Sequence, residues 1–166
     1  MRRRKRRGSA MLEFTLAGIP VIFVLISTFE MSRGMWVYHG LAHAVNAGAR
    51  FAVVRGRGCT THGNACATTV GGVARRIARE MIALPPDRFD VRLASDAGPV
   101  ECSPLSACFH DGTPFPPANA NSPGMNIGVT ARHEFRSAMS MFWPGAGAVR
   151  IGAVTLGAEA RQRIEF

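Results

Sequence analysis

A basic block and the apolar run behind it constrain this chain more than any other part of its sequence. Residues 2–7 are five arginines and one lysine, and residues 9–29 are apolar or small apart from Glu13. As a helix, a run of about twenty residues extends about 30 Å, which is the thickness of the hydrocarbon core of a bilayer. We therefore predict an N-terminal helix that is long enough to cross a membrane.

The carboxylate of Glu13 is costly in such a helix. A charged side chain near the middle of a bilayer costs about 3 kcal/mol, although Glu13 lies near one end of the run and could be protonated or reach the headgroups. Cleavage between Gly8 and Ser9 would create an amino group one helical turn before Glu13, or within reach of a neighbouring subunit. We therefore expect Glu13, with Phe14, to set the axial register of packed helices.

This N-terminal pattern resembles the TadE-like pseudopilins of bacterial tight-adherence pilus systems. The residues that carry the resemblance are Gly8-Ser9-Ala10-Met11-Leu12-Glu13-Phe14, Phe29, Glu30, Arg33, Trp36 and Ala47-Gly48-Ala49-Arg50. Residues 152–155 and 161–165 add weaker support. The resemblance implies cleavage after Gly8 by a prepilin peptidase. It also implies a role as a minor subunit in pilus assembly or secretion, with other pilin or pseudopilin subunits and the assembly machinery as partners.

Other N-terminal signals fit the sequence less well. A secretory signal peptide should have a small-x-small cleavage site soon after its apolar core, but residues 29–33 are Phe-Glu-Met-Ser-Arg. The small-x-small pattern of residues 42–44 comes too late in the chain. A twin-arginine signal would rest on Arg6 and Arg7 alone, and any long basic block contains such a pair.

The charge distribution predicts the orientation of the chain in the membrane. The formal net charge is +9, but six of the twenty basic residues lie in residues 2–7, and the remaining fourteen against eleven acidic residues leave +3. Basic residues stay on the cytoplasmic side of a membrane, so everything after the apolar run should lie outside the cytoplasm. We therefore expect an inner-membrane protein with a cytoplasmic N-terminus, and no nucleic acid as a partner.

The four cysteines fit an oxidising compartment. Cys59, Cys66, Cys102 and Cys108 allow three pairings. We favour Cys59 with Cys66 and Cys102 with Cys108, because each pair closes a short loop, and the crossed pairings stay open. The alternative is a zinc site that uses Cys59, His62 and Cys66 with Cys102 or His110, but it lacks a doubled motif.

Helical periodicity continues past the apolar run. Apolar residues recur at steps of three and four from residue 31 to residue 53, so the first helix should extend from residue 9 to about residue 55, with a kink at Pro20. A second apolar stripe, from Val70 to Met81, predicts an amphipathic helix that Pro85 and Pro86 end. We favour packing of this helix against a sheet over a basic helix on the membrane surface.

Alternation of apolar and polar residues predicts about three strands, at residues 89–94, 127–135 and 149–157. Residues 94–124 should form a long surface loop. Residues 137–143 should form a short helix whose apolar side chains pack in the core, with an apolar patch that faces a partner as the alternative. The predicted fold class is α+β, with a long hydrophobic helix and a small head with a second helix and an antiparallel sheet. The chain divides into a leader (1–8), a transmembrane helix (9–29), its outer continuation (30–55) and an extracytoplasmic head (56–166).

The sequence contains no motif of a known catalytic or cofactor site. It has no phosphate-binding glycine loop, no Gly-x-Ser-x-Gly elbow and no His-Glu-x-x-His helix. His39 and His43 are one turn apart, but no acidic or cysteine residue lies at a suitable spacing, so we expect no metal site there. We expect a protein that is not an enzyme and binds no cofactor or metal.

The sequence therefore predicts a minor pseudopilin that acts in pilus assembly after cleavage of its leader. The main alternative is a single-pass anchored protein with an uncleaved leader, whose head binds a cell-wall or surface ligand. A periplasmic metal-binding module built on Cys59 and His62 is a third possibility. A position along the fibre, a position at its tip and retention in the membrane are equally compatible with the sequence.

Overall fold

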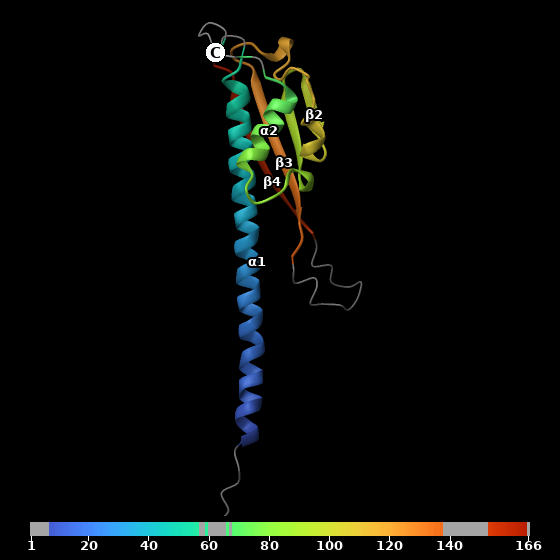
Figure 1. Ribbon diagram of the computed structural model, residues 1–166. Coiled ribbons are helices and arrows are strands. Elements are labelled where there is room, and N and C mark those ends of the chain that lie inside the picture. The colour runs from blue at the N-terminus through green and yellow to red at the C-terminus, as the bar shows by residue number, and fades with distance from the viewer. Residues whose placement is uncertain (1–6, 57–58, 60–65, 67, 138–152, 166) are drawn as a thin grey trace, which may run out of the picture.

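One long helix runs the length of the molecule and carries a small head at one end (Figure 1). The computed structural model describes residues 7–56, 59, 66, 68–137 and 153–165. Helix α1 (Arg7–Val53) has 47 residues. Pro20 lies inside it without ending it, as expected where the proline interrupts only one hydrogen bond of a long helix.

Helix α2 (Val70–Glu80) packs beside the outer part of α1. The side chain of Thr69 caps its first turn by accepting a hydrogen bond of 3.1 Å from the backbone N–H of Gly72. The predicted apolar stripe is buried, and Ile77 from this stripe lies against Gly48 of α1. The second helix that the sequence predicts is therefore confirmed.

Four strands form one antiparallel sheet, in the order β2-β1-β3-β4. The strands are β1 (Asp90–Ser95), β2 (Gly98–Cys102), β3 (Asn126–Phe135) and β4 (Val154–Arg163). The α+β class is confirmed, and the expected count of about three strands is corrected to four. The strand predicted at residues 149–157 corresponds to β4, which begins at Val154 and continues to Arg163; residues 149–152 lie outside the described part.

Strand β2 is the one that the sequence pattern missed. It has five residues, among them Pro99 and Glu101, which are poor indicators of a strand. Gly98 has a φ of +132°, which suits the tight turn between β1 and β2. As an edge strand, β2 tolerates a proline because only one of its sides pairs with a neighbour.

The segment 94–124 contributes to the core, and the expectation of a long surface loop is wrong. It contains β2 and the short 3₁₀ helices η3 (Leu105–Cys108) and η4 (Ala118–Ala120). Leu105, Phe115 and Ala120 are almost fully buried. The segment is rich in proline and serine, so its pattern did not indicate that these few apolar residues are buried in the core.

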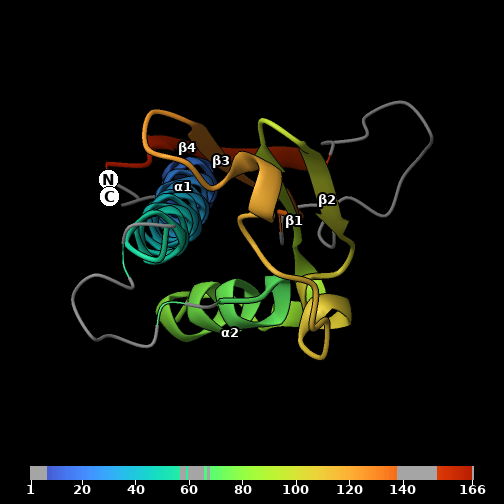
Figure 2. The same ribbon diagram turned by 90° about the horizontal axis from the view of Figure 1, so that it is seen from above.

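The head has two layers. Helices α1 and α2 lie on the same side of the sheet, as the view along α1 shows (Figure 2). Between the layers lies one apolar core, to which both helices and all four strands contribute. The short helix or apolar patch expected at residues 137–143 begins at the edge of the described residues, and its residues 138–143 lie outside them.

Candidate assembly helix and its junction with the head

The first half of α1 is an uncovered apolar rod. Most side chains between residues 11 and 36 are exposed, and the most apolar stretch of the helix has no part buried inside the protein. The head first reaches α1 near the end of this region, where Arg33 bonds to the carbonyl of Arg136, and beyond it Val37 and Leu41 are buried. An exposed apolar surface of this size requires lipid or other helices around it.

The hydroxyl side chains in this half of α1 satisfy their hydrogen bonds within the helix. The hydroxyls of Thr15, Ser27, Thr28 and Ser32 each donate to the carbonyl oxygen four residues earlier, at 2.8 or 2.9 Å. Such bonds remove donors that would otherwise be exposed to an apolar environment. The half therefore suits both a bilayer and a bundle of helices.

The residues that the sequence assigns to cleavage and register lie at the start of this rod. Gly8 and Ser9 lie in the first turn of α1. Glu13 follows Ser9 by one turn, or about 6 Å along the axis. Both Glu13 and Phe14 are exposed, Phe14 by 79%, so a neighbouring helix could contact them.

A buried carboxylate marks the point where α1 meets the head. The side chain of Glu30 is only 10% exposed, and its Oε2 lies 3.2 Å from Nη2 of Arg33. The same Nη2 donates a hydrogen bond of 2.6 Å to the carbonyl oxygen of Arg136, just after β3. The guanidinium of Arg33 also lies 4.6 Å from the ring centroid of Phe135. This set, Glu30, Arg33, Phe135 and the Arg136 carbonyl, is called the junction below.

Sequence reasoning identified only half of the junction. Glu30 and Arg33 belong to the pattern that resembles the TadE-like family, and an acidic residue three positions before an arginine indicates a pair on one helix face. Their partners lie more than a hundred residues away in the chain. No local pattern indicates such a contact.

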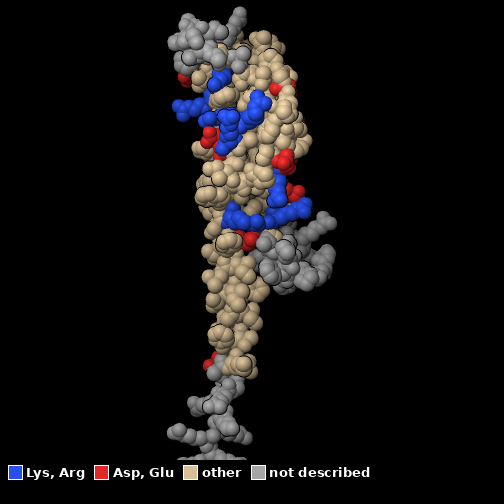
Figure 3. Space-filling model, viewed as in Figure 1, with Lys and Arg blue, Asp and Glu red and all other residues tan. Residues whose placement is uncertain are grey.

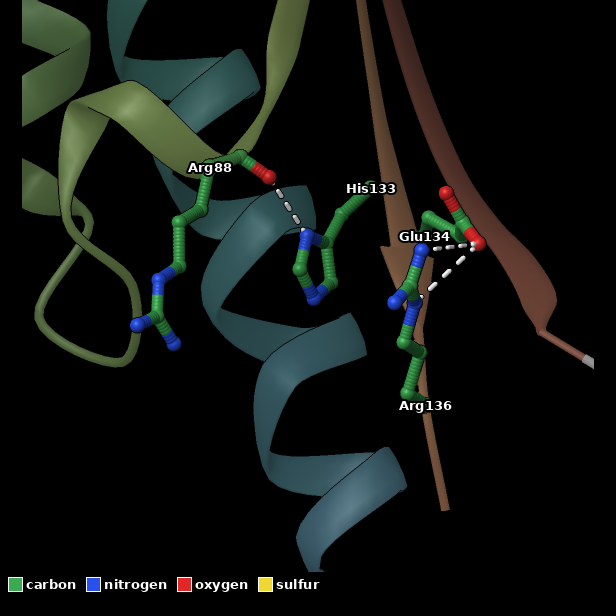
Figure 4. A network of polar contacts seen from close by, with 4 residues as sticks. All are labelled: Arg88, His133, Glu134 and Arg136. Atoms are coloured by element: carbon green, nitrogen blue, oxygen red, sulfur yellow. Dashed lines mark hydrogen bonds and ion pairs between the residues drawn. The ribbon is translucent and has the colours of Figure 1, made fainter. Parts of the chain in front are cut away.

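A second polar contact ties β3 to the turn before β1 (Figure 4). Nδ1 of His133 lies 2.6 Å from the carbonyl oxygen of Arg88, which requires the ring to carry its proton on Nδ1. The neighbouring Glu134 accepts two hydrogen bonds, of 3.2 and 3.3 Å, from Arg136. The first contact joins two segments of the head and the second is local to one segment, and neither brings an acid, a base and a nucleophile to one place.

The cysteines form two short disulfide loops. Cys59 is bonded to Cys66 and Cys102 to Cys108, which is the pairing that the sequence favours. Because the sulfurs of a disulfide are not thiolates, Cys59 and Cys66 cannot act as ligands of the alternative zinc site. Among the described residues, no group of three potential metal ligands occurs. His43 lies 3.9 Å from Glu80 of α2, and His39 stacks edge-on with Tyr38.

The fold and the exposed rod define a class of protein: a small α+β head on a single long apolar helix that has the length of a membrane anchor. Within this class, the model of the TadE-like protein family matches residues 8–50, which lie entirely in α1. The resemblance stated from the sequence is therefore confirmed, and it points to tight-adherence pilus systems. No curated protein and no solved structure matches the chain.

Proposed function

We propose that the chain is a minor pseudopilin of a tight-adherence pilus or a related secretion apparatus. A prepilin peptidase cleaves it between Gly8 and Ser9, after which α1 leaves the membrane and packs among the helices of other subunits. The observation that carries this proposal is the uncovered apolar half of α1, continuous with a helix that is firmly bound to the head. The TadE-like match over the same residues supports it.

In this proposal the role of the protein is structural and not catalytic. Before cleavage, the basic residues 2–7 hold the N-terminus in the cytoplasm and the head lies outside the inner membrane. The two disulfides are compatible with that compartment. The hydroxyls bonded inside α1 allow the helix to pass from lipid to a bundle without leaving polar groups unsatisfied.

Glu13 connects cleavage to assembly. The amino group of a new N-terminus at Ser9 has a pKa near 8 in an ordinary environment, so it is largely protonated at neutral pH. Paired with the carboxylate of Glu13 on the same or a neighbouring chain, it would neutralise a charge that is costly to bury among apolar helices. An unpaired carboxylate would oppose that packing.

The first test is the N-terminal sequence of the mature protein after co-expression with a prepilin peptidase. The expected mature chain begins at Ser9, and a Gly8→Leu variant should retain its leader. A chain that keeps residues 1–8 in the presence of active peptidase would contradict the proposal. It would favour an anchored binding protein with an uncleaved leader.

The second test separates cleavage from register. Glu13→Gln keeps the shape of the side chain but removes its charge, so membrane insertion and cleavage should survive. Incorporation into sheared fibres should fall by roughly 10- to 100-fold, because a charge-assisted hydrogen bond contributes about 1.5–3 kcal/mol. Thr15→Ala, two residues further along the exposed helix and on nearly the opposite face, is the control and should assemble normally. Normal assembly of Glu13→Gln would disprove the register mechanism.

A further inference from the structure

An open groove lies between α1 and α2 at the end of α1 that is far from the apolar rod. Its volume is about 550 Å³, and this basic groove is lined by His43, Asn46, Ala47, Arg50, Phe51, Val54, Arg55, Arg76, Glu80 and Gln162. Arginine side chains gather over the upper ends of α1 and α2 in Figure 3. The groove therefore combines several cations with an apolar floor.

The charges of the basic groove are only partly balanced within the protein. Glu80 is its one acidic lining residue, and its Oε1 lies 2.8 Å from Nη2 of Arg76. In the described part of the chain, no carboxylate forms an ion pair with Arg50 or Arg55. An additional negative charge placed in the groove would therefore meet two guanidinium groups without displacing an existing pair.

One of these guanidinium groups is already held in position. The Cζ atom of Arg55 lies 3.6 Å from the ring centroid of Phe51. Nη1 of Arg55 also donates a hydrogen bond of 3.1 Å to the carbonyl oxygen of Phe51. Val54 beside it is 50% exposed. Arginine is enriched among the residues that dominate the binding energy of protein interfaces, and an arginine that is already fixed loses less side-chain entropy on binding.

The carboxylates of this chain are largely engaged already. The glutamates that form ion pairs with arginines of the same chain are Glu30, Glu80, Glu101, Glu134 and Glu159. Asp87 and Asp90 accept hydrogen bonds from serines. Hydrogen bonds from the side chain and backbone of Thr113 hold the pKa of Asp111 below its ordinary value. A complementary acidic surface is therefore better supplied by a different chain than by a second copy of this one.

The position of the groove argues against lipid as its occupant. Arg50 follows Trp36, the last residue of the exposed rod, by fourteen residues, which is about 21 Å along the helix axis. Headgroups extend only about 5–8 Å beyond the hydrocarbon core on each side. The groove thus faces the space beside the head and not the membrane surface.

We propose that the basic groove binds an acidic segment of a partner protein. Carboxylates of that segment pair with Arg50 and Arg55, while an apolar side chain covers Phe51 and Val54. This contact goes beyond the assembly of α1 and does not depend on removal of the leader. It gives the head a partner-binding surface at the level of the outer part of α1.

The test uses the full chain in detergent and a labelled peptide of alternating Glu and Leu, with a matched peptide of Gln and Leu. Fluorescence anisotropy should show at least tenfold tighter binding of the acidic peptide at 50 mM NaCl, and most of this difference should vanish at 500 mM. Arg50→Glu should weaken the binding of the acidic peptide at least tenfold. Arg161→Glu makes the same charge change on β4, outside the groove, and should alter binding less than twofold.

Further outcomes decide between occupants. A photoreactive residue in place of Asn46, inside the groove, should cross-link the acidic peptide and lose the product when Arg50→Glu is added. The proposal would be overturned if both peptides bound equally well. It would also be overturned if Arg161→Glu weakened the binding of the acidic peptide as much as Arg50→Glu does. Competition by inorganic phosphate at micromolar concentration, which indicates a small-anion site, would overturn it too. A dimer of the chain as the main cross-linked product in membranes would assign the groove to a second copy. All these readouts are valid for the uncleaved chain, so failure of the pseudopilin proposal would not affect them.

Discussion

The two halves of α1 have the same backbone and opposite environments. Between residues 11 and 36 the apolar side chains are exposed, whereas from Val37 onward one face of the helix is buried against α2 and the sheet. The outer half meets the head with small residues such as Ala44, Gly48 and Ala49, whereas the inner half presents large ones such as Phe14 and Leu16. Helix packing within the protein thus stabilises one half, and the other half retains its apolar surface for lipid or partner subunits.

The largest expected difference between the halves comes from truncating a leucine in each. Leu41 is fully buried, so Leu41→Ala should reduce the free energy of unfolding of the head by about 2–5 kcal/mol. Leu25 is 64% exposed, and Leu25→Ala should change the free energy of unfolding of the head by less than about 0.5 kcal/mol. Thermal unfolding of the solubilised protein, followed by near-UV circular dichroism, measures both. Equal effects would mean that the inner half is also part of the folded core.

A matched pair of glycines gives the next largest contrast. A Cβ at Gly48 would lie 2.4 Å from Cγ1 of Ile77, whereas a Cβ at Gly18 would have no heavy atom within 4 Å apart from the backbone of its own helix. Gly48→Ala should therefore cost about 1–3 kcal/mol of head stability through overpacking. Gly18→Ala should leave the stability of the head unchanged. The same unfolding experiment checks the pair, and a neutral Gly48→Ala would show that α2 moves away from α1 at little cost.

The sequence predicted the parts of the fold that depend on local periodicity. The stripe that includes Val73 and Ile77 correctly indicated α2, and the alternation around Val129 correctly indicated β3. It failed at β2, where Pro99 and Glu101 obscure a strand that only pairing with β1 stabilises. It also failed in segment 94–124, where isolated residues such as Leu105 are buried by contacts distant in sequence.

The candidate site shows the same division. The exposed rod could be predicted because its composition alone determines its environment. The junction could not, because Arg33 meets the carbonyl of Arg136 across 103 positions of sequence. The basic groove was also missed, since Arg50, Arg55 and Arg76 come from two segments whose approach depends on the close contact of Gly48 with Ile77.

The smallest expected effect tests where the two halves of α1 divide. Arg33→Ala removes the ion pair with Glu30, the hydrogen bond to the Arg136 carbonyl and the contact with the Phe135 ring, which together should cost about 1–2 kcal/mol of head stability. Arg136→Ala keeps that carbonyl and loses only an exposed ion pair with Glu134, so its cost should stay below about 1 kcal/mol.

The distance between α1 and β4, the strand that pairs with the end of β3, gives a readout that stability alone does not. Spin labels at Ser32 and Thr155 should show a single narrow distance in the parent protein and in Arg136→Ala, and a broader distribution in Arg33→Ala. Arg33→Lys should be intermediate, because lysine keeps the charge but has no planar group to stack on Phe135. An unchanged distribution in Arg33→Ala would mean that the core around Val37 and Leu41 fixes the head by itself. In that case the boundary between the halves would lie at Val37 and not at Glu30.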